Sequence, residues 1–231
     1  MTRSTHADIA SINLPAEACD RNQLTMRLRT RALIAWLRRL GRQPHAVRWR
    51  WADRLGWLYL NGDPVFREVL MTNLRLCITR DAAECMRLAR QNAAETYFAW
   101  IDRFRVWELT AEQTRDQVSL DGIEHLNSHR GQPVVLLCPH FLPMEAAIQR
   151  LALEVSTVAL YQPAADLEFE AIRRAARCRF NAQILVEATA PLLPVVRDVA
   201  AGTPLFILPD LDTGQAAHTF VPFFGTSAAT A

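Results

Sequence analysis

The sequence contains no lysine, and its five cysteines include no C-x-x-C pair. All 26 basic residues are therefore arginines, a bias that genome composition alone can produce, so we infer no function from it. An odd number of scattered cysteines does not suit a disulfide framework, and a reduced protein on the cytoplasmic side fits it better. The cysteines are Cys19, Cys77, Cys85, Cys138 and Cys178.

Long apolar runs are also missing. A helix that spans a bilayer needs roughly 18–20 apolar residues, and the best candidate, residues 32–40, is short and interrupted by Arg38 and Arg39. The first residues are polar, and no apolar core precedes a small-residue cleavage site, so we expect no signal peptide. The sequence therefore predicts neither a spanning helix nor a cleaved leader.

The composition is that of a globular protein. Half of the 231 residues are hydrophobic, and the length is enough for one sizeable α/β domain with its own core. The formal net charge is +2, but the charge is unevenly distributed. Residues 1–60 hold 11 basic and 4 acidic residues, a local net charge of +7, whereas the remainder holds 15 basic and 20 acidic residues, −5.

The first half of the chain is predicted to be helical after a polar tail at residues 1–22. Leu33, Trp36, Leu37 and Leu40 recur at helical spacing, so a helix is expected from about residue 24, and Gly41 with Pro44 should end it. Further helices are expected at 47–60, 64–77 and 81–109, and Thr110 is a plausible cap for a short helix after them.

Residues 24–60 interleave tryptophans with arginines, and this pattern has two interpretations. One is an amphipathic anchor in the membrane interface, where indole rings lie at head-group depth and arginines meet anionic lipid. The other is a nucleic-acid surface with alternating basic and aromatic residues. We favour the membrane and expect no nucleic acid as a partner, because no nucleic-acid motif accompanies the charge.

The pattern changes near residue 117 to short apolar runs that alternate with helical segments. This alternation predicts an α/β fold with a mostly parallel central sheet flanked by helices on both faces. PVVLLC at 133–138 is a continuous apolar run typical of a buried strand. The expected strands are 118–120, 133–138, 155–161, 183–186 and 204–208, and the expected helices are 143–153, 167–180 and 190–200.

His140 is the first candidate for chemistry, because it follows the predicted strand at 133–138. Ligands in open α/β sheets bind at the carboxyl ends of strands. Glu145 comes five residues later, which on a regular helix would turn the two side chains about 140° apart. Pro143 favours a helix that begins there, so we expect His140 in the preceding loop and Glu145 folded back against its imidazole.

Such a pair suits acyl transfer to an alcohol. A neutral imidazole removes the proton of a hydroxyl as the oxygen attacks a thioester carbonyl. The carboxylate fixes the tautomer of the imidazole and stabilises the imidazolium, as in a serine triad. We therefore predict His140 as the general base and Glu145 as its partner, with no nucleophile from the protein.

Several blocks of the sequence resemble one family. HFLPME at 140–145 resembles the His-x4-Asp/Glu block of the lysophospholipid acyltransferase superfamily. LPDLDTG at 208–214 and FVPFFGTSAAT at 220–230 are similar to blocks of the lipid A late acyltransferases, which add a secondary acyl chain to a lipid A precursor. NLRLC at 73–77, DGIEHL at 121–126, and Tyr161 followed by RCRF at 177–180 match the same family.

The resemblance implies partners and site residues. The donor would be an acyl carrier protein thioester, the acceptor a membrane glycolipid hydroxyl, and no cofactor or metal would be needed. The enzyme would lie on the cytoplasmic face of a bacterial inner membrane as a peripheral or monotopic protein, bound through residues 24–60. Arg177 and Arg179 would face phosphate or a head group, Asp210 would lie at the sheet edge beside His140, and the pocket wall would include Phe223, Phe224 and Gly225.

The same resemblance divides the chain into a tail at 1–22, membrane-associating helices at 23–62 and an acyltransferase-like α/β domain at 63–231. The family continues well beyond the block in which Ala231 stands, so we expect a C-terminal truncation. Gln162 and Pro163 stand where the family often has an arginine, and Leu142 and Pro143 also depart from its pattern. Two alternatives therefore stay open: a degenerate membrane-binding protein without activity, or an acyltransferase for another membrane lipid.

Overall fold

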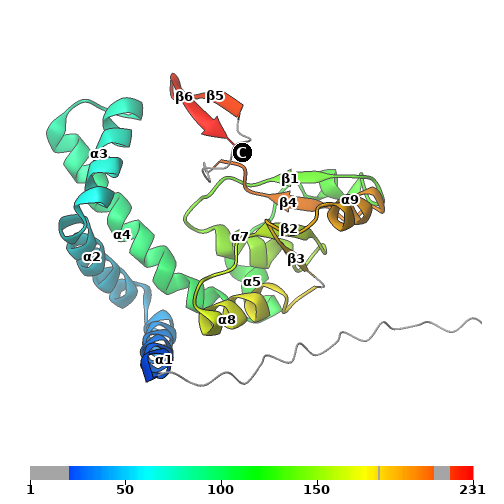
Figure 1. The fold of residues 1–231 in the computed structure, drawn as a ribbon, viewed down its shortest axis with the longest axis horizontal. Helices are drawn as coiled ribbons and strands as arrows, with labels where there is room; N and C mark the ends of the chain where they lie inside the picture. Colours follow the sequence, from blue (N-terminus) through cyan, green and yellow to red (C-terminus); the bar gives the residue numbers. More distant parts are fainter. Residues whose placement is uncertain (1–20, 182, 211–218, 231) are drawn as a thin grey trace, which may run out of the picture.

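The computed structural model describes residues 21–181, 183–210 and 219–230. The predicted tail, apart from its last two residues, lies outside these residues, as do Asp212 and most of the LPDLDTG block. Long helices come first, and Figure 1 shows them in a row beside an α/β unit. They are α1 (Arg21–Gly41), α2 (His45–Gly62), α3 (Pro64–Cys77) and α4 (Ala82–Val106).

The boundaries of these helices follow their capping residues. Asp63 accepts a hydrogen bond from the Phe66 amide at 3.0 Å, and Pro64 occupies the first turn of α3. Asp81 caps α4 in the same way through the Glu84 amide at 2.7 Å. The predicted C-terminal end of the first helix near Gly41 and both bounds of the 64–77 helix are confirmed, whereas the first helix begins at Arg21 rather than at about residue 24.

Helices α2 and α4 pack closely through small residues. Ala52 of α2 and Ala89, Ala93 and Ala94 of α4 are buried. Gly56 lies between them, and a Cβ atom built on it would stand 2.6 Å from the carbonyl carbon of Ala93. No real Cβ fits at that distance from backbone, so the helix spacing depends on a glycine at position 56.

We expect Gly56→Ala to destabilise the protein although alanine is the better helix former. Overpacking typically costs 1–3 kcal/mol, which exceeds the gain of about 1 kcal/mol in helix propensity. Gly62→Ala is the matched control, because nothing lies within 4 Å of the Cβ that it adds at the end of the same helix. Chemical denaturation of both variants measures the difference, and equal stability would contradict the close packing.

The short helix α5 (Ala111–Gln117) confirms the predicted cap. Thr110 and Gln113 form a capping box, with hydrogen bonds of 3.1 Å and 3.0 Å between each side chain and the other residue's amide. The strand predicted at 118–120 is wrong, since this segment pairs with no described strand. The carbonyl of Val118 instead accepts a hydrogen bond from Arg150 at 3.0 Å, and α6 (Ile123–Asn127) follows.

The central sheet is parallel throughout, as the sequence predicts. Its strands are β1 (Val135–Leu137), β2 (Val158–Tyr161), β3 (Ile184–Glu187) and β4 (Leu205–Ile207), in the order β1-β4-β2-β3. Pairing of Leu137 with Ile207 brings the carboxyl ends of β1 and β4 together. The segments that leave these two strands, far apart in the sequence, therefore begin side by side.

Three helices connect the strands: α7 (Met144–Leu151), α8 (Leu167–Arg177) and α9 (Leu193–Ala200). The connections through α7 and α8 cross the sheet in one direction, and the connection through α9 crosses in the other. Because such crossovers are right-handed, α7 and α8 lie on one face and α9 on the opposite face. This arrangement agrees with a sheet that carries helices on both faces.

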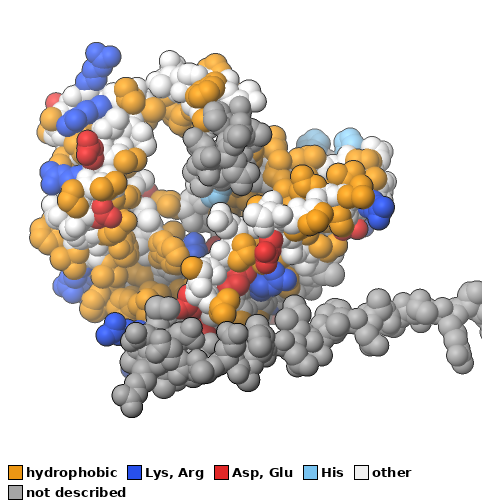
Figure 2. Space-filling model, in the orientation of Figure 1, with side chains coloured by type: hydrophobic (Ala, Val, Ile, Leu, Met, Phe, Trp, Pro, Cys, Tyr) orange, Lys and Arg blue, Asp and Glu red, His pale blue; other side chains and the backbone are white. Residues whose placement is uncertain are grey.

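The expectation that the 133–138 strand is buried is wrong. Val135 and Leu137 are 52% and 69% exposed, because β1 is an edge strand that pairs with β4 alone among the described strands. Figure 2 shows hydrophobic side chains gathered on the surface around β1, β4 and α9. The exposed members on α9 and the turn before it are Leu192, Leu193 and Val196.

The described chain ends in an antiparallel hairpin, β5 (Thr219–Phe223) and β6 (Thr226–Thr230). Phe224 and Gly225 form its turn with φ values of 49° and 76°, as a tight two-residue hairpin turn requires. Among the described helices, none has the length and apolar character to cross a bilayer. Trp36, Trp49, Trp51 and Trp57 are partly exposed on α1 and α2, and membrane binding by this segment stays a prediction.

Candidate functional site

His140 and Asp210 meet at the carboxyl edge of the sheet, where the segments after β1 and β4 run side by side. The Nδ1 atom of His140 lies 2.7 Å from Oδ1 of Asp210, and the backbone amide of His140 donates to Oδ2 at 2.7 Å. One carboxylate thus holds both the ring and the main chain of His140. The predicted position of Asp210 at the same sheet edge as His140 is confirmed.

The electrostatics favour a charged Asp210. Partial burial by itself would raise the pKa of this carboxyl group, but the hydrogen bonds from the amide and the imidazole of His140 outweigh it and hold the pKa below its usual value. An ionised carboxylate only accepts hydrogen bonds, so Nδ1 of His140 carries the proton in this contact. In the neutral form of this ring the lone pair lies on Nε2, which can act as a base.

Glu145 is buried in the first turn of α7. The helix begins directly after Pro143, which is its N-cap residue rather than the expected first helical residue. Its carboxylate accepts a hydrogen bond from the indole nitrogen of Trp107 at 3.0 Å and forms an ion pair with Arg177. Burial tends to raise the pKa of Glu145, but the charge and hydrogen bond of Arg177, the Trp107 hydrogen bond and the charge of Arg103 lower it overall.

The expectation that Glu145 folds back against the imidazole of His140 is therefore corrected. Both side chains line one cavity, but the partner of the imidazole is Asp210, and the partners of Glu145 are Trp107 and Arg177. The physical reason is the start of α7: its first turn faces α4 and α8, whose donors take up the Glu145 carboxylate. Whether Glu145 also acts in catalysis stays a prediction.

A cavity of about 650 Å³ lies between the sheet and the helices α7 and α8. This is within the usual range of ligand pockets, about 300–1,000 Å³. Its wall is largely apolar, with a cluster of polar and charged groups that includes His140, Glu145, Arg103, Arg173 and Arg177. The apolar wall is formed by Met144, Ile148, Leu151, Ala152, Ala159, Leu160, Leu185, Leu192, Phe206, Ile207 and Leu208.

The structure separates the two arginines that the sequence predicts to act together. Arg177 reaches the cavity, where it pairs with Glu145. Arg179 instead donates to Gln149 at 2.7 Å and to the backbone carbonyls of Leu109 and Val106 at 2.6 Å and 2.9 Å. The expectation that Arg179 faces a head group is corrected, because its guanidinium ties the end of α8 to α4 and α7.

The hairpin residues lie elsewhere. Phe223 and Phe224 are exposed, their rings contact each other with centroids 4.7 Å apart, and neither residue lines the described cavity. Gly225 supplies a positive φ to the turn. In this structure the prediction that these three residues shape the pocket wall is not met, because the hairpin packs mainly on itself.

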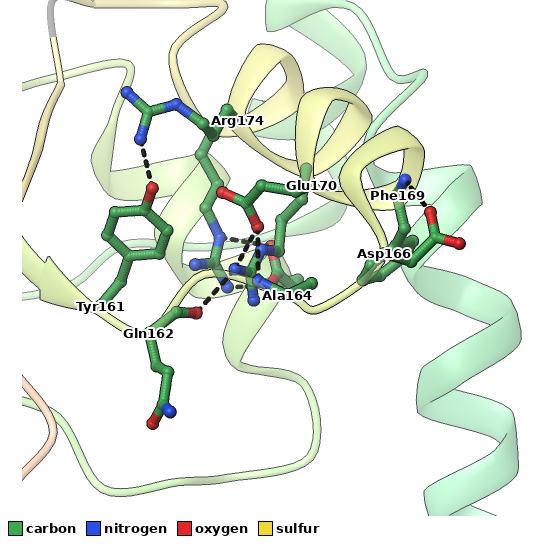
Figure 3. A network of polar contacts seen from close by, with 10 residues as sticks. Tyr161, Gln162, Ala164, Asp166, Phe169, Glu170 and Arg174 are labelled. Carbon is green, nitrogen blue, oxygen red and sulfur yellow. Dashed lines mark hydrogen bonds and ion pairs between the residues drawn. The ribbon is translucent and has the colours of Figure 1, made fainter. Parts of the chain in front are cut away.

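A polar network surrounds Tyr161, which the sequence indicated only as part of a family block. Tyr161 lines the cavity at the end of β2, and its hydroxyl contacts Arg174 of α8 (Figure 3). Glu170 accepts a hydrogen bond from the Ala164 amide at 2.9 Å and forms an ion pair with Arg173. These contacts fix the loop between β2 and α8 along one side of the cavity.

Sequence reasoning missed Arg103, Trp107 and Arg173 as site residues. Arg103 and Trp107 belong to the end of α4, where their spacing shows only an amphipathic helix, and no motif surrounds Arg173. The signal in the sequence that could have indicated Arg103 is a basic residue on an otherwise apolar helix face. Within the described ranges, no group of three or more His, Cys, Asp or Glu side chains is placed to hold a metal ion.

Comparisons with known proteins agree with one another. The sequence profile of the family described as bacterial lipid A biosynthesis acyltransferase matches residues 21–231. A lipid A biosynthesis acyltransferase of Haemophilus influenzae is 23% identical over 173 residues, which cover 73% of this chain and 55% of that protein. A lipid A biosynthesis palmitoleoyltransferase of Escherichia coli is 23% identical over 155 residues, 66% of this chain and 50% of its own length. The chain spans about half the length of these relatives.

Proposed function

Because the chain belongs to the bacterial lipid A biosynthesis acyltransferase family, we propose that it transfers a fatty acyl chain from an acyl carrier protein thioester to a hydroxyl of a lipid A precursor. The observation that carries this proposal is the contact of His140 with Asp210 at the wall of a largely apolar cavity. It supplies an oriented base beside a space suited to an acyl chain.

His140 is the proposed general base. Its Nε2 accepts the proton of the acceptor hydroxyl as the hydroxyl oxygen attacks the thioester carbonyl carbon. The tetrahedral intermediate collapses when the carbon–sulfur bond breaks, and the departing thiolate takes the proton back from the imidazolium. Asp210 keeps the proton of the neutral ring on Nδ1 and stabilises the imidazolium, so no nucleophile of the protein is required.

Glu145 is proposed as a positioning residue. Its buried carboxylate holds Arg177 and Trp107 within the wall that also contains His140. Its ion pair with Arg177 offsets a positive charge that would otherwise oppose a protonated imidazole in the transition state. The apolar wall formed by α7, β2 and β4 would take the acyl chain, since burial of each methylene contributes about 0.8 kcal/mol.

The proposed place of action is the cytoplasmic face of a bacterial inner membrane. Support comes from α1 and α2, which combine partly exposed tryptophans with exposed arginines at positions 38, 39, 50 and 54. Such a surface suits the interface of an anionic leaflet. A glycolipid acceptor also requires an enzyme that reaches the bilayer.

Incubation of the purified chain with an acyl carrier protein loaded with a defined fatty acid tests the proposal. With a lipid A precursor as acceptor, mass spectrometry should detect a product heavier by one acyl group. Binding to anionic vesicles with no acylated product from any carrier-bound chain would instead support a degenerate membrane-binding protein. Acylation of a phospholipid or ornithine lipid alone would exclude the lipid A acceptor.

A further inference from the structure

Arg103 is a partly buried cation at the end of α4 for which the proposed reaction has no role. It lines the cavity that contains His140, and its guanidinium carbon lies 4.1 Å from the ring centroid of Trp100 and 5.9 Å from that of Trp107. The Nε atom is buried without a hydrogen-bond partner. Among the described residues, the guanidinium of Arg103 takes part in neither a hydrogen bond nor a salt bridge.

The neighbouring charges leave Arg103 in excess. Arg177 is paired with Glu145, and Arg173 is paired with Glu170. Three guanidinium groups therefore face two carboxylates, and this cluster carries a net charge of +1. Burial lowers the pKa of Arg103, the charge of Glu145 raises it, and the like charges of Arg177 and Arg173 lower it further. A guanidinium stays charged under such influences, so the excess charge persists.

A buried charge without a partner is costly unless a ligand provides one. We propose that Arg103, together with Arg173 and Arg177, forms an anion subsite that binds a phosphate group of a substrate of His140. Guanidinium groups suit phosphate because they offer paired donors in a fixed plane. The contacts with Trp100 and Trp107 orient the Arg103 group before the ligand arrives.

The inference rests on the proposed function, in which two substrates carry phosphate. One is a phosphorylated glycolipid acceptor, and the other is the phosphate-linked arm that carries the acyl thioester. The subsite would place either phosphate in the same cavity as the base. Both substrates would present the same phosphate chemistry to the subsite, so an experiment must distinguish the acceptor from the donor.

Inorganic phosphate is the first probe, because its binding needs no activity. At constant ionic strength, replacing chloride by phosphate should raise the melting temperature of the wild-type chain, and Arg103→Gln should abolish the rise. Arg90→Gln is the matched control, since Arg90 is on the same helix but exposed and paired with Asp53 outside the cavity. An equal phosphate effect in wild type and Arg103→Gln, or none in wild type, would overturn the subsite.

The stability of Arg103→Gln without phosphate is a second, independent measurement. Removal of an unpaired, partly buried charge should leave the melting temperature unchanged or higher, as is common where function costs stability. Arg103→Lys keeps the charge but loses the planar donors, so its phosphate effect should be smaller than that of wild type. A clear fall in the phosphate-free melting temperature of both variants would mean a structural role and overturn the proposal.

Kinetics identify the source of the phosphate. If it belongs to the acceptor, Arg103→Gln should raise the KM for a phosphorylated acceptor about tenfold and leave the KM for its dephosphorylated form unchanged. If it belongs to the donor, the KM for the acyl carrier protein should rise instead. Unchanged KM values for both substrates would overturn the proposal. Phosphate binding by a wild-type chain that transfers no acyl group supports the subsite and contradicts the proposed function.

Discussion

His140→Ala is expected to lower acyl transfer by about 1,000-fold, because a positioned general base contributes on the order of 10²–10⁴ to the rate. The loss should appear in kcat, since the imidazole acts on the proton that moves in the transition state. The ring of His140 is partly exposed, and among the described side chains its polar partner is Asp210. Removing it should therefore leave the fold intact.

Initial rates with a saturating acyl carrier protein donor measure this effect, and circular dichroism with vesicle sedimentation checks folding and membrane binding. His125→Ala is the matched control, because His125 is an exposed histidine on α6 with no part in the cavity. Its rate should equal that of wild type. Undiminished transfer by His140→Ala would remove the imidazole from the mechanism.

The two carboxylates of the site are expected to respond differently to substitution. Asp210→Asn should lower kcat by about 100-fold or more, because an amide no longer fixes the tautomer of His140 or stabilises the imidazolium. Its effect on the free energy of unfolding should be small, since Asp210 is partly exposed. Glu145→Ala should instead destabilise the protein by about 3–5 kcal/mol, because it leaves the buried guanidinium of Arg177 without a partner.

Denaturant titrations and initial rates on the same preparations separate these effects. The double variant Glu145→Ala/Arg177→Met should recover part of the stability, since it removes both buried charges. A large loss of transfer in a stably folded Glu145→Gln, with Asp210→Asn fully active, would return the role of partner to Glu145. That result would contradict the assignment made from the hydrogen bonds of His140.

The pH dependence of stability follows from the same carboxylates. The folded-state pKa of Glu145 lies below the ordinary value of a glutamate side chain, so folding favours its charged form. Its contribution is present above the unfolded pKa and is lost as the pH falls through the lower folded pKa. Wild type should therefore lose stability in this acidic window, and Glu145→Ala should show a shallower decline.

Local patterns in the sequence were sufficient for most elements. Alternating apolar and helical segments predicted the parallel sheet, and the helix starts expected at 64 and 81 and the cap expected at Thr110 agree with the structure. The strand at 118–120 failed, because a strand needs a paired edge and Val118 gives its carbonyl to Arg150. The family resemblance is confirmed by the profile over residues 21–231.

The hydrogen-bond partners within the site could not be predicted from local sequence patterns. Position after a strand singled out His140, and the family resemblance placed Asp210 at the same edge of the sheet, where the structure finds it. The choice of a partner for His140 depended on which donors surround each carboxylate. Trp107 and Arg177 lie 38 and 32 positions from Glu145 in the sequence. Local spacing in the sequence does not predict contacts between residues so far apart.

The sequence by itself determined the fold class and the family, and it singled out His140 as the candidate base. These rest on periodicity, capping and motif blocks, which are local properties of the chain. Only the tertiary structure decided that Asp210 holds His140, that Arg179 is an internal tie and that Arg103 is left without an acidic partner among the described residues. Hydrogen bonds and ion pairs between distant segments depend on how the helices pack against the sheet, and packing is a property of the whole fold.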